Sequence, residues 1–232
     1  KAELMDVFSR LAAEKAEVRL INDYKGIPVS NEATVEDLDG TGVILRVGKN
    51  QCVCLELERF THIQSPALPT IIKARVESLD FLSLHAKLTG FEYASETIGR
   101  RTVLRVQPKS PLDVLIFYEG KKIRGSLADI SSMGIGVFML SAYIYDAGML
   151  RKGEAIQVHI RLPITKGGWN EVRLPGTIRY VNRDKGSFRL GIDTDPEMYV
   201  KTQISRYVDQ RQAETLRELR VLYDTFYRLK QE

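Results

Sequence analysis

Cysteine, histidine and tryptophan are scarce in this 232-residue sequence, with two, three and one copies. Cys52 and Cys54 would lie on one face of a strand, with Cα atoms roughly 6.6–6.8 Å apart, which is poor disulfide geometry. A disulfide-stabilised secreted protein is therefore disfavoured, and a reducing cytoplasm is the expected location. His62, His85 and His159 are scattered without metal-ligand spacing, so no metal site is predicted.

Long hydrophobic runs are also missing. No segment approaches the ~20 apolar residues that span a bilayer, and the longest apolar stretches, such as 114–118, are strand-sized, so no membrane insertion is expected. No basic-then-apolar leader opens the sequence, although a removed leader stays open because the first residue is Lys1.

Signals for catalysis are absent as well. The sequence shows no Ser–His–Asp order with supporting context, no paired catalytic carboxylates and no Gly-x-x-x-x-Gly-Lys-Ser/Thr loop, so we expect neither an enzyme nor a nucleotide triphosphatase. No cofactor is predicted. The net charge of +4 tolerates anionic partners but does not by itself predict nucleic-acid binding.

The first part of the sequence predicts a short helix and then a small β-barrel, which we assign to an accessory domain over 1–96. Apolar residues at helical spacing predict a helix at 3–16. Short runs bounded by turn residues then predict strands, at 18–21, 33–38, 43–47, 52–57, 70–76 and 81–88.

The polar, glycine-containing segment 95–101 is interpreted as a linker to a second domain at 97–195. After it the strand pattern resumes, and six strands at this spacing predict a second β-barrel. Their expected positions are 112–118, 123–130, 134–140, 155–161, 171–181 and 187–193. The predicted fold class is mainly β, with two small β-barrels in tandem, a short N-terminal helix and a long C-terminal helix.

A third segment, 196–232, contains no glycine or proline beyond Pro196 and predicts a helix on the order of 50 Å long. An apolar stripe at three- and four-residue steps runs along it, interrupted by Arg211 and Thr215. The stripe has two interpretations, which are packing along its own domain or a seam between two helices of a homodimer.

An arginine cluster followed by a turn-forming motif carries the functional signal. The residues are Arg100, Arg101, Arg105, Asp129, Ser131, Gly134 and Gly136. Arg-x-x-x-Arg spacing alone is uninformative, because it recurs at Arg179/Arg183, which we interpret as an exposed strand and turn pair. Its combination with Asp-x-Ser-x-x-Gly on a barrel is specific.

These residue types suit a ligand that carries both guanine and phosphate. A guanidinium is a flat, permanently charged fork that grips phosphate or pairs with the O6 and N7 edge of guanine. An ionised aspartate accepts the N1–H and N2–H donors of the other guanine edge, and a serine hydroxyl donates to a phosphate oxygen. Glycines permit close backbone approach and φ values denied to other residues.

The motif resembles that of the PilZ domain, a bacterial receptor for cyclic di-GMP. The continuation at 176–181 and 190–193 resembles the last two strands of that family, and the upstream barrel resembles the accessory domain of flagellar-brake-type PilZ proteins. The resemblance implies that Arg101 and Arg105 hold the phosphates and guanine faces, and that Arg100 adds a third guanidinium, compatible with a stacked pair of ligands.

The resemblance further implies that Asp129 reads a guanine edge and that Ser131 bonds phosphate or nearby backbone. Gly134 and Gly136 would shape the turn. We expect ligand binding to order the linker and change the arrangement of the two barrels, with flagellar motor components as the protein partner. The alternatives are a protein-interaction scaffold with a vestigial nucleotide site and, with less support because aromatic residues are few, a single-stranded nucleic-acid binder.

Overall fold

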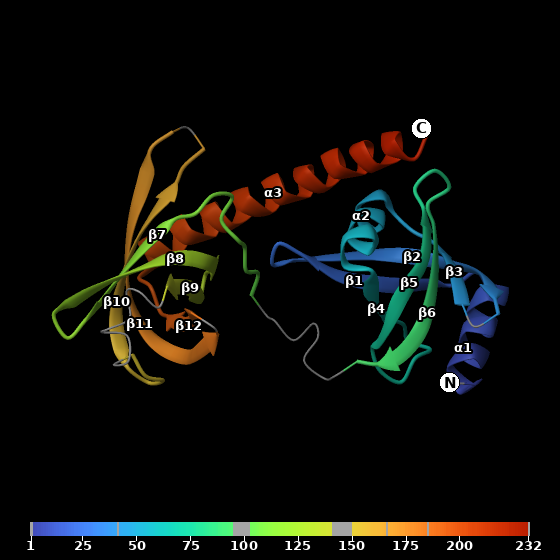
Figure 1. The fold of residues 1–232 in the computed structure, drawn as a ribbon, viewed down its shortest axis with the longest axis horizontal. Helices are drawn as coiled ribbons and strands as arrows, with labels where there is room; N and C mark the ends of the chain where they lie inside the picture. Colours follow the sequence, from blue (N-terminus) through green and yellow to red (C-terminus); the bar gives the residue numbers. More distant parts are fainter. Residues whose placement is uncertain are drawn as a thin grey trace. The chain divides into compact units, whose positions relative to one another are not determined.

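The computed structural model of the protein describes residues 2–40, 42–94, 103–140, 150–165, 167–184 and 186–231. Within these ranges the chain is mainly β and divides into two compact units, which are the two groups of strands in Figure 1. The first unit comprises Lys1–Arg101 and Thr215–Glu232, and the second comprises Thr102–Glu214. The linker predicted at 95–101 lies outside the described residues, and the domain boundaries predicted from the sequence stay predictions.

A closed barrel with the strand order β1-β2-β3-β6-β5-β4 forms the first unit. Helix α1 (Ala2–Ala13) buries Leu4, Phe8 and Leu11 in the core of this barrel, so the predicted amphipathic helix is confirmed. The strands are β1 (Glu17–Tyr24), β2 (Ile27–Asp39), β3 (Gly42–Arg46), β4 (Phe60–Gln64), β5 (Ile72–Asp80) and β6 (His85–Tyr93).

The strand predicted at 52–57 is wrong, because Lys49–Glu58 forms helix α2. Five consecutive residues of this helix, 51–55, are buried, so its buried positions do not follow one face and the sequence displays no amphipathic period there. The helix ends at Arg59, which takes the left-handed conformation (φ 60°) and donates its N–H to the carbonyl of Leu55. The buried Gln51 donates to Asn22 Oδ1 at 2.5 Å, so its polar side chain is satisfied in the core.

Two further differences from the predicted strands concern the same barrel. Strand β4 was not predicted, because its five residues include His62 and a polar end and so offer a weak apolar pattern. The strand predicted at 81–88 is half turn, since β5 ends at Asp80 and β6 begins at His85. Asp80 stabilises this turn by accepting hydrogen bonds from the N–H of Leu82 and the hydroxyl of Ser83.

The second unit contains another closed barrel, with the strand order β10-β11-β12-β9-β8-β7, and its prediction from the sequence is confirmed. All six pairs are antiparallel, so outward and inward side chains alternate along each strand. The strands are β7 (Asp113–Tyr118), β8 (Lys121–Ser131), β9 (Gly134–Leu140), β10 (Ala155–Pro163), β11 (Trp169–Asp184) and β12 (Ser187–Thr194).

The long helix α3 (Met198–Leu229) is divided between the units, with residues up to Glu214 in the second and residues from Thr215 in the first. Ile204 and Val208 are buried in the earlier part. Leu219 and Tyr223 are buried in the core of the first barrel, where the Tyr223 hydroxyl donates to the carbonyl of Phe81 at 3.1 Å. Much of the predicted apolar stripe is thus buried against other parts of the same chain. The homodimer stays a prediction.

The two cysteines of helix α2 give a test of the first core. Burial raises the pKa of the Cys52 and Cys54 thiols to about 12 each, and neighbouring carboxylates add to the shift. We expect the folded protein at pH 8 to hold almost no thiolate and to react with an aromatic disulfide reagent only as fast as the core opens. In guanidinium chloride both thiols should react at once. Reaction of the native protein at the denatured rate would contradict this burial.

Candidate functional site

The predicted motif lies where β8 turns into β9 on the second barrel. Ser131 is buried at the end of β8, and its hydroxyl donates to the carbonyl of Gly134 at 3.1 Å. The same hydroxyl accepts the N–H of Met133 at 3.4 Å. The Met133 carbonyl in turn accepts the N–H of Thr194 at 3.0 Å, which ties the turn to the end of β12. Ser131 therefore bonds nearby backbone, one of the two roles that the resemblance implied.

The glycines of this surface are needed because neighbouring atoms leave no room for a side chain, and not because of unusual backbone angles. A Cβ atom at Gly136 would lie 2.6 Å from Asp129 Oδ2, and one at Gly134 would lie 2.9 Å from the carbonyl of Ile192. Gly191, opposite Gly136 on β12, is covered by the ring of Tyr180, which a Cβ atom would meet at 2.1 Å. Glycine is thus required by close packing against Asp129 and its surroundings.

Arg105 is brought to Asp129 by backbone pairing. The next residue, Val106, is fully buried and pairs with Ile130 of β8 through two hydrogen bonds of 2.9 and 3.0 Å. This pairing places the guanidinium of Arg105 with Nη1 at 3.4 Å from Asp129 Oδ1. The structure therefore joins these two predicted site residues, whereas Arg100 and Arg101 lie outside the described residues.

Asp129 is held from its other side by an arginine that the sequence analysis missed. Arg189 of β12 places Nη2 at 2.5 Å from Asp129 Oδ2, and its guanidinium lies 5.3 Å from the centroid of the Phe138 ring. Asp129 is only 6% exposed, so its charge is compensated by arginines and not by water. The strand alternation of 187–193 marks Arg189 as outward-facing, but the sequence gives no sign of its partner 60 residues away.

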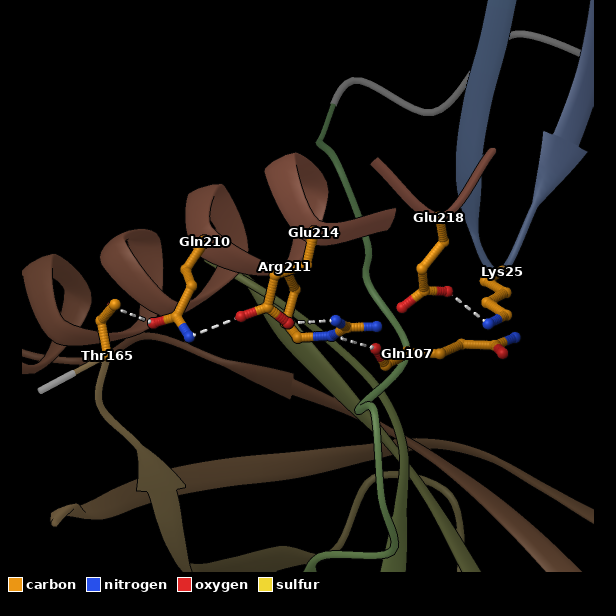
Figure 2. A network of polar contacts seen from close by, with 7 residues as sticks. All are labelled: Lys25, Gln107, Thr165, Gln210, Arg211, Glu214 and Glu218. Atoms are coloured by element: carbon orange, nitrogen blue, oxygen red, sulfur yellow. Dashed lines mark hydrogen bonds and ion pairs between the residues drawn. The ribbon is translucent and has the colours of Figure 1, made fainter. Parts of the chain in front are cut away.

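Residues 105–107, which precede the second barrel and are called the lead-in below, also contact helix α3. The contact is made by a buried arginine of the helix, seen in Figure 2. Arg211, one of the two residues that interrupt the apolar stripe, is 2% exposed and donates from Nε to the carbonyl of Gln107 at 3.2 Å. It also pairs with Glu214, which accepts from Gln210 at 2.8 Å. Burial opposes ionisation of Glu214, but the bonds from Gln210 and Arg211 outweigh it and lower its pKa. The backbone next to Arg105 is thereby anchored to α3.

The second Arg-x-x-x-Arg pair is used differently. Arg179 lies on β11 with a side chain 70% exposed, and its Nε is 3.6 Å from Asp193 Oδ2. Arg183, near the end of the same strand, lies 5.5 Å from the centroid of the Phe188 ring. Among the described residues, both arginines contact partners on the neighbouring strand β12 and neither pairs with Asp129, in agreement with a surface strand pair.

The described residues contain neither a cluster of metal ligands nor a helix suited to a bilayer. No group of three His, Cys, Asp or Glu side chains is placed to hold a metal ion. None of the helices in the described ranges combines the length and apolar character that crossing a bilayer requires.

Fold and site together define a tandem β-barrel protein with an arginine-flanked aspartate on its second barrel. Residues 100–210 match the model of the PilZ domain family. An uncharacterized protein from Aquifex aeolicus (strain VF5) is 31% identical over 129 residues, which make up 55% of this chain and 57% of the relative. The chain thus matches little more than half the length of that relative.

The solved structures to which the chain is similar include those of two bacterial proteins. The Bacillus subtilis inhibitor of motility MotI/DgrA is 16% identical, with 85% of this chain and 96% of that chain covered and a TM-score of 0.44. YcgR from Escherichia coli in complex with c-di-GMP is 14% identical, with 94% and 93% covered and a TM-score of 0.43. The family assignment rests on the match of residues 100–210.

The buried Arg211 predicts a specific loss of stability. Arg211→Ala removes the Nε donor to the carbonyl of Gln107 and the ion-pair partner of Glu214, which keeps only the bond from Gln210 among those described above. We expect the free energy of unfolding of the second unit to fall by about 2–4 kcal/mol. Urea unfolding followed by the fluorescence of Trp169, the single tryptophan, measures this unit. Arg206→Ala removes the same charge from an exposed site on α3 and should change stability by about 0.5 kcal/mol or less. Equal effects of the two substitutions would show that Arg211 has no such anchoring role.

Proposed function

We propose that the protein is a non-enzymatic receptor for cyclic di-GMP that binds at the β8–β9 turn of the PilZ domain. The observation that carries the proposal is the buried Asp129 with the Arg105 guanidinium beside it, in a region that matches this family. Arg101 and Arg105 hold the phosphates and guanine faces, with Arg100 as a third guanidinium. Asp129 accepts from the N1–H and N2–H of guanine.

The contact lengths support an exchange of partners at Asp129. The Arg105 contact of 3.4 Å lies at the long end of hydrogen bonding, and the side chain of Arg105 is 35% exposed. Arg105 therefore loses little when it turns towards a dianionic ligand, where it makes a charge-assisted bond. The oxygen that it leaves accepts a guanine donor. Ser131 and Gly134 keep the turn in shape, and Gly136 leaves room for the Asp129 carboxylate.

Binding at Arg105 also suggests a route to a conformational response. The lead-in segment is attached to β8 at Val106 and to α3 through the bond between Arg211 and the Gln107 carbonyl. Helix α3 ends in the core of the first unit, at Leu219 and Tyr223. We infer that ligand binding orders the lead-in and favours one arrangement of the two units by its differential affinity for it. Regulation of flagellar motility or related surface behaviour, through motor components, is the output that the family resemblance suggests.

A protein-interaction scaffold with a vestigial nucleotide site is the second candidate. Val221 and Leu229 of α3 are 65% and 61% exposed, and such apolar residues suit a partner or a second copy of the chain. Size-exclusion chromatography with and without cyclic di-GMP separates the two functions. If the protein is a receptor, we expect cyclic di-GMP to change its elution volume or its thermal stability. If it is a scaffold with a vestigial site, we expect neither change.

Titration calorimetry with cyclic di-GMP tests the receptor directly. Arg105→Ala removes a charge-assisted bond worth roughly 1.5–3 kcal/mol, so we expect the affinity to fall about tenfold or more. Arg101→Ala is expected to weaken binding similarly. Arg183→Ala is the matched control, because Arg183 has the same sequence spacing but contacts Phe188 on the barrel, and it should bind as the unmodified protein does. Micromolar or tighter binding that survives both Arg101→Ala and Arg105→Ala would rule out this site.

A further inference from the structure

We infer that Arg189 is a specificity-determining residue of this site, because it keeps the Asp129 carboxylate paired and oriented to accept from guanine when Arg105 moves to the ligand. The inference rests on the proposed binding of a guanine-containing cyclic dinucleotide. It concerns a residue of β12 that lies outside the motif of arginines, aspartate, serine and glycines considered so far. Arg189 acts through Asp129 and is therefore a positioning residue.

The two carboxylate oxygens of Asp129 have different arginine partners. Oδ1 is 3.4 Å from Arg105, and Oδ2 is 2.5 Å from Arg189. A carboxylate whose side chain is 9% exposed needs a positive partner, and breaking a buried pair by removing one partner is strongly unfavourable. Guanine is neutral, so it supplies hydrogen-bond donors but no compensating charge. When Arg105 turns to a phosphate, Arg189 is the remaining described counter-charge of Asp129.

Arg189 is held in place before any ligand arrives. It lies directly opposite Phe138 in the β12–β9 pairing, and its guanidinium lies 5.3 Å from the ring centroid, within cation–π range. Ser126 of β8 is opposite Phe138 on its other side, so the three residues form a cross-strand row on the outer face of the barrel. A fixed guanidinium fixes the carboxylate that it binds, which lowers the entropic cost of recognition.

A cavity of about 300 Å³ adjoins this row, which leaves room for ligand atoms next to Arg189. The segment 107–111 forms one wall, 126–128 of β8 forms another, and Phe138 and Arg189 complete the lining. The side chain of Arg189 is 43% exposed, so the part that does not bind Asp129 is open to this space. The lead-in that carries Arg105 continues directly into the wall of the cavity.

The chemistry of the carboxylate predicts which base is preferred. An ionised carboxylate has acceptors only, so it matches the paired N1–H and N2–H donors of guanine and opposes the N1 acceptor of adenine. A site with a buried group that must be hydrogen-bonded discriminates strongly against the analogue that lacks the donors. Without Arg189, Asp129 pairs with Arg105 instead. Both dinucleotides then meet mainly the arginine–phosphate contacts, which are the same for each.

The experiment compares cyclic di-GMP with cyclic di-AMP by titration calorimetry on the full chain. Arg189→Gln keeps a long polar side chain but removes the charge, and Arg189→Lys keeps the charge. We expect Arg189→Gln to weaken cyclic di-GMP binding about tenfold or more and to narrow the preference for it over cyclic di-AMP, with Arg189→Lys in between. Arg183→Gln is the matched control. Arg183 also lies over an aromatic ring, that of Phe188, which is its partner in the β11–β12 pairing.

Phe138→Leu provides a variant that does not alter any charge. Phe138 is 47% exposed, so the substitution leaves the barrel core intact, and it removes the ring that holds Arg189. We expect the preference for cyclic di-GMP to narrow here too, by less than in Arg189→Gln. This variant and Arg189→Lys decide the question if Arg189→Gln does not fold, as judged by circular dichroism.

The outcomes separate the inference from the proposed function. Failure of the unmodified protein to bind cyclic di-GMP removes the proposed function and the inference together. If the unmodified protein binds and the folded Arg189 and Phe138 variants retain its preference between the two dinucleotides, the inference alone is wrong. A uniform loss of affinity for both dinucleotides, with the preference unchanged, would also overturn it, because it would reduce Arg189 to a general positive charge.

Discussion

The antiparallel pairing of β9 with β8 on one side and with β12 on the other is the constraint on which the candidate site depends. This pairing sets Asp129 opposite Gly136 and Gly136 opposite Gly191, so that the carboxylate packs against Gly136 and the ring of Tyr180 covers Gly191. It also brings Arg189 within hydrogen-bonding distance of Asp129. A shift of one residue in either pairing would move these side chains to the other face of the sheet and destroy the site.

A buried carboxylate between two arginines is a poor source of stability but a good recognition element. Desolvation of the charges consumes much of the attraction between them, so the cluster contributes less to folding than apolar packing would. The two arginines differ in their distance to the Asp129 carboxylate, 2.5 Å for Arg189 and 3.4 Å for Arg105. Arg189 lies close to Asp129 and its guanidinium lies near the Phe138 ring, whereas Arg105 is farther from Asp129 and lies on the lead-in. In the proposed function, it is Arg105 that the ligand would recruit.

The polar residues that interrupt the apolar stripe of α3 are not exposed, and one of them connects the helix to the lead-in. Arg211 and Thr215 interrupt the stripe in the sequence, yet both are buried. Arg211 bonds the backbone carbonyl of Gln107, two residues beyond Arg105, and a backbone acceptor of this kind leaves no trace in sequence periodicity. The contact between α3 and the lead-in therefore cannot be predicted from the amphipathic pattern of the helix.

Local patterns in the sequence predicted two barrels and the terminal helices, because strand alternation, helical spacing and turn residues are short-range signals. The association of Arg105 with the aspartate motif was instead implied by the resemblance to a known family. The tertiary structure decided what depends on burial and register. It showed that 49–58 is a helix, which the sequence did not indicate because the buried residues 51–55 are consecutive and do not follow one face. It also added Arg189 to Asp129, since the contact joins residues 60 positions apart through two strand pairings that no local pattern specifies.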